Sequence, residues 1–287
     1  MASLKEVKGR IASVNSTRKI TSAMKMVASA KLHKAQAAIE SMLPYERRLH
    51  HILTDFMSNC TGVTSPFIVK REVKKVAVVV FASNTSLCGG FNANVIRHLV
   101  DLLAEYKPLG LENILVFPVG KKVADAVRKL GFRIEGDFQH MADKPSYQEA
   151  ADLAADLMKR FLHGDVDKVE LLYNHFKSTA SQILTRETYL PIDLNNEKKE
   201  EERTIDYILE PSAEELMQEM LPKVLRMKMF TVLLDSNAAE HAARTMAMQI
   251  ATDNANELLQ ELTVMYNKSR QQSITNELLD IVGGSMA

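Results

Sequence analysis

The chain has 287 residues, 46% hydrophobic and 25% charged, enough to bury a sizeable core and to form more than one structural unit. Its 36 basic and 36 acidic residues balance, which excludes the polyelectrolyte character that dictates binding to nucleic acid or to a membrane surface. Cys60 and Cys88 are too few for a disulfide framework and lack metal-ligand spacing, which favours a reducing compartment. No apolar run approaches about 18 residues and no signal peptide opens the chain, so we expect any membrane association to go through a partner.

The first expected element, assigned to residues 1–60, is a long helix from about Ser3 to Asn59. Ser3 and Glu6 have the spacing of a capping box at its start. Pro44 is predicted to kink or divide the helix. An apolar line is expected along one face, at Leu4, Val7, Ile11, Val14, Ile20, Met24 and Val27.

This helix is also strongly basic, with ten Lys and Arg against three Glu in the first 48 residues. Three interpretations are open: a solvated helix face, a surface that meets acidic loops of a partner, or a nucleic-acid surface. The last is the weakest, because no aromatic residue precedes Tyr45 and no binding motif is present. We therefore predict no nucleic-acid partner.

A Rossmann-like α/β domain with a mostly parallel sheet is predicted for residues 72–193, because apolar strand patterns alternate there with helical ones. Expected strands are 74–81, 113–119, 169–176 and 181–190, and expected helices are 92–106, 123–130 and 146–162.

Two glycine turns in this domain follow strands and open helices, Gly89-Gly90 and Gly120-Lys121-Lys122. Either could hold a phosphate on free backbone N–H groups, but neither has a nucleotide-binding spacing. We interpret both as tight strand-to-helix turns. The histidines are scattered, and Cys88 has no evident companion base, so no catalytic, cofactor or metal site is predicted.

A charged linker, Asn195 to Arg203 within residues 194–211, leads to the last unit at 212–287. Ser212 is expected to cap a helix there. Lys223 to Val282 is a run of sixty residues without Pro or Gly between Pro222 and Gly283, which predicts a rod roughly 90 Å long. Its expected apolar line is Ala243, Met246, Ile250, Leu258, Leu262, Met265, Leu278 and Ile281.

Two long terminal helices around a compact domain predict an antiparallel coiled coil that projects from a globular base, with the C-terminal helix the longer. Such a stalk exposes much apolar surface per residue, which favours enclosure by a ring of other subunits. Several methionines, Met24 and Met26 among them, would give a surface able to repack against different neighbours, although some of them would fill the helix-helix contact.

Six motifs follow one another along the chain: Arg10 to Val14, Lys19 to Ala28, Leu87-Cys88-Gly89-Gly90, Ala242 to Met248, Ala251 to Asn254, and Arg270 to Ser285. In these motifs and in their order, the chain resembles the gamma subunits of F-type ATP synthase over its whole length. One departure is Ser83 to Ser86, where many members carry an acidic and a basic residue.

This resemblance implies a central rotor shaft without chemistry of its own. One copy would stand inside an alpha3beta3 hexamer, with the epsilon subunit and the c-ring at its foot, on the cytoplasmic face of the bacterial inner membrane. Met24, Lys25 and Arg244 match positions at the collar of the hexamer, and Arg270, Gln271 and Thr275 match contacts with beta-subunit loops. Tyr207 resembles a foot position near epsilon or the c-ring.

Two other classes stay open from the residues alone. One is a nucleotide-dependent α/β enzyme with helical extensions, which would bind nucleotide as an isolated chain. The other is a coiled-coil scaffold, which would associate with itself through its long helices.

Overall fold

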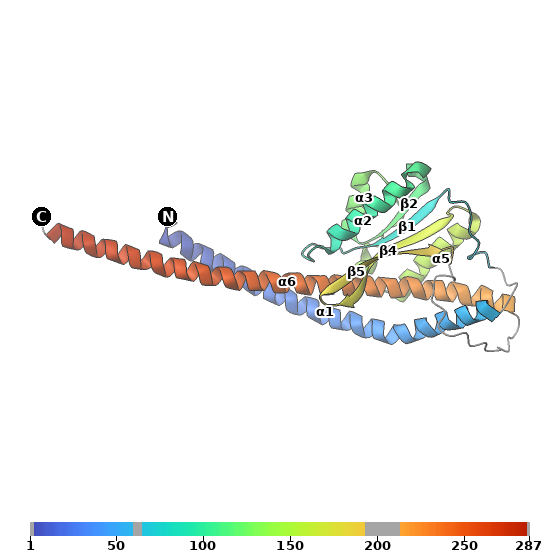
Figure 1. Ribbon diagram of the computed structural model, residues 1–287, viewed down its shortest axis with the longest axis horizontal. Coiled ribbons are helices and arrows are strands. Elements are labelled where there is room, and N and C mark those ends of the chain that lie inside the picture. Colours follow the sequence, from blue (N-terminus) through green and yellow to red (C-terminus); the bar gives the residue numbers. More distant parts are fainter. Residues whose placement is uncertain (1–2, 60–64, 193–212, 286–287) are drawn as a thin grey trace.

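The computed structural model describes residues 3–59, 65–192 and 213–285. Two end helices, α1 (Leu4–Asn59) and α6 (Ala213–Ser285), lie side by side and antiparallel, and an α/β domain sits against α6 (Figure 1). The predicted fold class, an antiparallel pair of terminal helices with an inserted Rossmann-like α/β domain, is confirmed. The expected linker at 194–211, together with Cys60 and Tyr207, lies outside the described residues.

Five strands form one sheet in the order β3-β2-β1-β4-β5, in which only β5 is antiparallel to its neighbour. The sequence predicted four of these strands but missed β3, and it also missed α4, because elements of two and five residues are too short to show a period. The strands are β1 (Val76–Phe81), β2 (Ile114–Val119), β3 (Arg133–Ile134), β4 (Lys168–Ser178) and β5 (Ser181–Leu190).

Helices cover both faces of the sheet. They are α2 (Phe91–Tyr106), α3 (Lys121–Leu130), α4 (Gln139–Asp143) and α5 (Tyr147–His163), with 3-10 turns at Lys107–Leu109 and Leu111–Asn113. Because strand side chains alternate, Val76, Val78 and Val80 of β1 pack toward α2 and α3. Ala77, Val79 and Phe81 face α5 and α6 instead.

α6 is therefore a layer of the α/β domain as well as half of the stalk. Its residues Leu221, Met229 and Leu233 are buried in the same apolar cluster as Leu153 and Leu157 of α5. The sequence pattern predicts a domain joined to a separate rod. In the structure the first part of the rod is instead part of the domain's core.

The prolines do not end the long helices. Pro44 lies inside α1 and Pro222 inside α6, which starts at Ala213 and also runs past Gly283, so the helix extends beyond both ends of the run from Lys223 to Val282. An interior proline costs about 3 kcal/mol or more. Around Pro222, buried Leu221 and Leu225 pack into the domain's core, and each such side chain contributes roughly 1.5–3 kcal/mol, enough to offset it.

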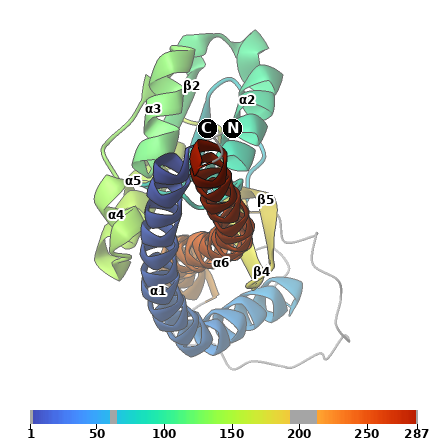
Figure 2. The ribbon, with the colours of Figure 1, turned by 90° about the vertical axis from the view of Figure 1, so that its left-hand side faces the viewer.

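The contact face of α1 follows a strict three-four spacing, which we call the inner line. None of its twelve residues is exposed: Leu4, Val7, Ile11, Val14, Arg18, Thr21, Lys25, Ala28, Leu32, Ala35, Ile39 and Met42. A matching line on α6 comprises Met248, Thr252, Ala255, Leu259, Leu262, Tyr266, Ser269 and Ser273. This spacing is the heptad pattern of a left-handed coiled coil. Seen along its length, α1 curves around α6 (Figure 2).

Much of the expected apolar line was wrong. Ile20 and Val27 are 58% and 59% exposed, and on α6 the side chains of Ile250, Leu258, Met265, Leu278 and Ile281 are also exposed. The three-four spacing of the inner line explains this difference. Counted onward from Val14, the spacing falls on Arg18, Thr21 and Lys25, and then on Ala28 and Leu32. The helices keep this continuous register, although it leaves larger apolar side chains outside.

Candidate functional site

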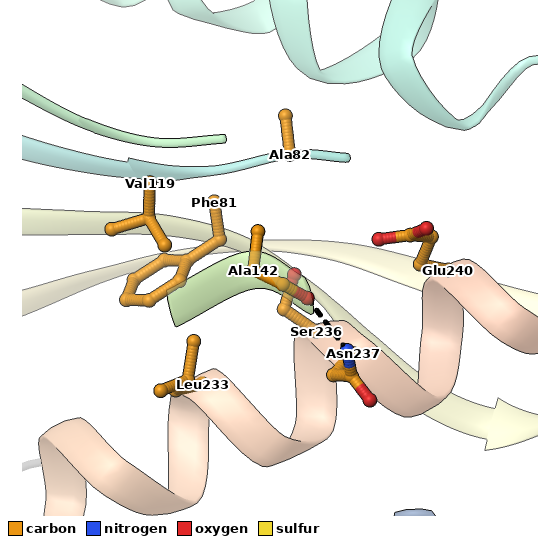
Figure 3. A pocket seen from close by; sticks show the side chains of 8 residues that line it. All are labelled: Phe81, Ala82, Val119, Ala142, Leu233, Ser236, Asn237 and Glu240. Carbon is orange, nitrogen blue, oxygen red and sulfur yellow. Dashed lines mark hydrogen bonds between the residues drawn. The ribbon is translucent and has the colours of Figure 1, made fainter. Parts of the chain in front are cut away.

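The carboxyl ends of β1 and β2, where open α/β sheets usually bind ligands, are covered by α6. Phe81 and Val119 face Leu233 and Asn237 across a space of only about 10 Å³, which holds no more than one water molecule (Figure 3). Asn237 Nδ2 also donates a hydrogen bond to the Ala142 carbonyl oxygen at 2.8 Å. A nucleotide has no room at this edge of the sheet.

The two glycine turns are also occupied by protein. Gly89 has φ +59° and lies against α6, where its Cβ position is 3.8 Å from the Ala247 Cβ. At Gly120, φ is +118° and a Cβ would come within 2.2 Å of the Ala82 carbonyl oxygen, so only glycine fits. The backbone N–H of Lys121 donates to Asn84 Oδ1 at 2.8 Å. The interpretation of both turns as tight strand-to-helix connections agrees with this packing.

No group of three or more His, Cys, Asp or Glu side chains suited to a metal ion occurs among residues 3–59, 65–192 and 213–285. Cys88 is buried, and its sulfur lies 3.2 Å from Asn92 Nδ2 and 3.7 Å from Ser83 Oγ. The described surroundings of Cys88 are those of a packed thiol held in a turn.

The candidate contact residues fall into two groups on the helix pair. Met24 and Lys25 are half-buried on α1, and Lys25 belongs to the inner line. Arg270, Gln271 and Thr275 are exposed on α6, where Thr275 Oγ1 donates to the Gln271 carbonyl oxygen at 2.9 Å.

The second group lies at the N-terminal end of α1 and just past it. Hydrogen bonds join Thr21 to Thr252 at 2.9 Å and Arg18 to Asn256 at 3.3 Å, so the start of α1 lies beside the region of α6 near Ser269. α6 continues past the N-terminus of α1 (Figure 1). Its exposed apolar side chains in this overhang are Ile274, Leu278, Leu279, Ile281 and Val282.

Arg244 differs from the other candidates because it is largely enclosed by its own chain. Its side chain is 12% exposed, and Nη1 lies 2.5 Å from Glu240 Oε1. Nη2 donates to Thr85 Oγ1 at 2.8 Å, in the loop that follows β1. Arg244 thus links α6 to the α/β domain.

Sequence reasoning missed the polar groups around Arg244. Burial raises the pKa of the Glu240 carboxyl, and the nearby Arg244 opposes that shift. Burial, followed by the positive charges of Arg244 and Lys31, lowers the pKa of His241 to about 4. A buried Glu and His inside a polar helix carry no signal in the sequence, but continuing the three-four spacing from Val14 would have found Arg18, Thr21 and Lys25.

Known proteins resemble the chain over its full length. The family model described as ATP synthase matches residues 3–287. A curated ATP synthase gamma chain from Phocaeicola vulgatus is 81% identical, with 100% of both chains covered, and one from Bacteroides fragilis is 65% identical, again with 100% of both covered. The chain belongs to the ATP synthase gamma chain family. It is therefore a non-catalytic rotor subunit of ATP synthase, and the resemblance inferred from the motifs is confirmed.

Solved structures agree on the fold. A chain of the Euglena gracilis mitochondrial ATP synthase superposes with a TM-score of 0.63 at 20% identity, covering 99% of this chain and 93% of that one. A chain of the Tetrahymena thermophila central stalk and c-ring gives 0.58 at 21% identity, covering 81% and 99%. At such identities the likeness concerns the fold alone. Within the described ranges, no helix is both long and apolar enough to span a bilayer.

Proposed function

We propose that one copy of this chain turns inside an alpha3beta3 hexamer, with α6 as the axis. The overhang, which is the part of α6 that continues past the N-terminus of α1, would lie at the end of the shaft away from the α/β domain. The observation that carries the proposal is the shape of the helix pair: α6 extends beyond α1 with an exposed apolar surface that none of the described residues covers. An enclosing ring would remove this surface from water. A two-helix shaft also presents a different face in every direction, and such asymmetry can distinguish three otherwise equivalent catalytic sites.

Small differences between faces are enough for this coupling. A difference of about 1.4 kcal/mol in contact free energy changes the nucleotide affinity of a site tenfold. Coupling is reciprocal, so nucleotide binding in the hexamer also drives the shaft. No reacting group of this chain is needed.

We assign Arg270, Gln271 and Thr275 to polar contacts with beta-subunit loops. Their side chains are exposed at the α1 terminus and just past it, where a surrounding ring can reach them. Met24 and Lys25 are assigned to the collar, and the epsilon subunit and c-ring to the opposite end. Tyr207, which lies outside the described residues, is assigned to contact with epsilon or the c-ring from its motif alone. The complex would carry the chain on the cytoplasmic face of the bacterial inner membrane.

Replacing Lys25 tests the collar assignment. In a reconstituted complex, we expect Lys25→Ala to lower the number of protons pumped per ATP by about twofold or more, because a weakened contact between shaft and hexamer lets ATP turn over without driving rotation. Lys19→Ala is the matched control, because Lys19 is exposed on the same helix and lies off the inner line. An unchanged ratio for Lys25→Ala, in a complex that assembles normally, would contradict the assignment.

Purification of a tagged chain tests the partners. We expect alpha, beta, epsilon and c subunits to copurify, with one copy of the tagged chain per complex. Copurification of two differently tagged copies would instead support a self-associating scaffold.

A further inference from the structure

The loop at residues 83–90, between β1 and α2, is fixed firmly within the α/β domain. Asn84 Nδ2 donates to the Gln139 carbonyl oxygen at 2.8 Å, and Asn84 Oδ1 accepts from the Lys121 N–H. Asn92 Nδ2 donates to Ser83 Oγ at 2.7 Å, and Asn92 Oδ1 accepts from the Ser83 N–H at 3.1 Å. These bonds tie the loop to three helices of the domain, so it moves with the domain as a unit.

The same loop packs on α6 through an apolar contact. Cys88 and Phe91 form a buried cluster with Ala239 and Ala243 of α6. Gly89 approaches Ala247 closely, and Leu87 takes a left-handed backbone conformation with φ 67° to bring the loop there. Because a bulky residue with positive φ is strained, the surrounding contacts must hold it in place.

Arg244 provides the polar part of this contact. Its Nη2 reaches three oxygens of the loop: Thr85 Oγ1 at 2.8 Å, the Ser86 carbonyl at 3.4 Å and the Thr85 carbonyl at 3.5 Å. Its Nη1 is held by Glu240 one turn earlier on α6, so the guanidinium has a fixed position. Because the guanidinium is charged, its hydrogen bonds to the loop are stronger than those of a neutral donor, although Thr85 and Ser86 themselves are exposed.

We propose that Arg244 is a positioning residue that fastens the 83–90 loop to α6, so that the α/β domain and the helix pair rotate as one body and stay joined throughout the cycle. This inference rests on the rotor function proposed above. It differs from assigning Arg244 to direct contact with the hexamer, because here Arg244 acts through the loop. Torque applied to the domain would reach the shaft through this junction as well as through the shared core.

A designed disulfide tests whether the contact between the 83–90 loop and α6, which we call the junction, must open during the rotary cycle. The 3.8 Å separation between the Gly89 Cβ position and the Ala247 Cβ is the usual Cβ–Cβ distance of a disulfide. We would combine Gly89→Cys and Ala247→Cys with Cys88→Ser, to avoid exchange with the neighbouring thiol, and reconstitute the whole complex. The two single-cysteine variants, each with Cys88→Ser, are controls for the strain of a side chain at position 89.

We expect the disulfide to form under mild oxidation, and ATP hydrolysis and proton pumping of the locked complex to stay within about twofold of the reduced complex. Failure of the disulfide to form would contradict the fixed docking of the loop. A loss of turnover on oxidation that a reductant reverses would show that the junction opens, and would overturn the proposal.

A rescue experiment distinguishes two roles of Arg244: positioning of the 83–90 loop and direct contact with a partner subunit. We expect Arg244→Ala to lower the protons pumped per ATP by about twofold or more, Arg244→Lys to lower the ratio less, and the disulfide to restore the ratio in the Arg244→Ala background. If Arg244 touched a partner directly, the disulfide would not restore it. Thr85→Val removes the main acceptor and leaves the Arg244–Glu240 pair intact, so it should reproduce a milder loss.

The outcomes also separate this inference from the rotor function. If the unaltered chain failed to assemble with a hexamer, the proposed function itself would fail. If assembly and pumping were normal and Arg244→Ala left the ratio of protons to ATP unchanged, only the positioning role would be wrong.

Discussion

His241 lies at the junction of helix pair and domain, where burial changes its chemistry. Its side chain is enclosed, and no hydrogen-bond partner to Nδ1 is present in the described part of the chain. The positive charges of Lys31 on α1 and of Arg244 disfavour protonation of His241, and Asp143 of α4 favours it. Glu240, the residue before His241 on α6, carries a second carboxyl group. Burial is the largest effect and lowers the pKa to about 4, so the folded chain holds His241 neutral.

Acid should therefore weaken the fold through His241. Because the folded pKa is about 4 and the unfolded value is about 6.5, the contribution of His241 is fully present above pH 6.5 and is lost as the pH falls toward 4. The loss is at most about 3 kcal/mol. Glu240, whose pKa is raised, contributes with the opposite sign, so only a comparison between variants isolates His241.

We expect the free energy of unfolding of His241→Gln, from urea titrations of the full chain, to fall less between pH 7 and pH 4.5 than that of the unaltered chain. His33→Gln is the control, because His33 is exposed on α1. Equal slopes for His241→Gln and the unaltered chain would show that His241 does not titrate in this way.

At the scale of elements, the two long helices owe their alignment to small and polar side chains as much as to apolar ones. Near the domain the helices approach through Ala35 of α1 and Ala238 and Ala242 of α6, with Leu32 beside them. Farther from the domain, Thr21 on the inner line of α1 is hydrogen-bonded to Thr252 on the matching line of α6. Polar residues at core positions of a coiled coil fix register at some expense of stability.

The alanine contact predicts a strong size effect. Ala242 has no exposed surface, so Ala242→Leu should destabilise the full chain by about 1–3 kcal/mol, because added methylenes cannot be accommodated without moving α1. Ala30→Leu, at an exposed position of α1, should change stability by less than about 0.5 kcal/mol. Urea denaturation measures both, and a neutral Ala242→Leu would show that the helices are not closely packed there.

For the whole molecule, the decisive feature is that α6 serves two structures. Its first part is a layer of the α/β core, its middle pairs with α1, and its last part extends alone. Each section has a different number of neighbours, so stability should fall along the helix toward Ser285.

Limited proteolysis tests this gradient. Among the described tryptic sites of the isolated chain, we expect Lys268 and Arg270, where the overhang begins, to be cut first, because the end of a helix with few tertiary contacts opens readily. In the assembled complex the same bonds should be protected at least about tenfold, if a ring encloses the overhang. Equal cleavage rates in both states would contradict enclosure. Earlier cutting at Lys121, within the domain, would contradict the gradient.

Residue patterns were enough to predict the order and type of the long elements, the antiparallel return of the chain and, through its motifs, the family. These follow from local rules: helix-forming composition over sixty residues, apolar runs such as Val76 to Phe81, and glycines at turns. The tertiary structure alone decided that α6 covers the carboxyl ends of β1 and β2, that the helix contact passes through Arg18, Thr21 and Lys25, and that Arg244 is enclosed by its own chain. Those features depend on which surfaces meet across long sequence separations, where the free energy gained by burying one face outweighs the preference of any single residue.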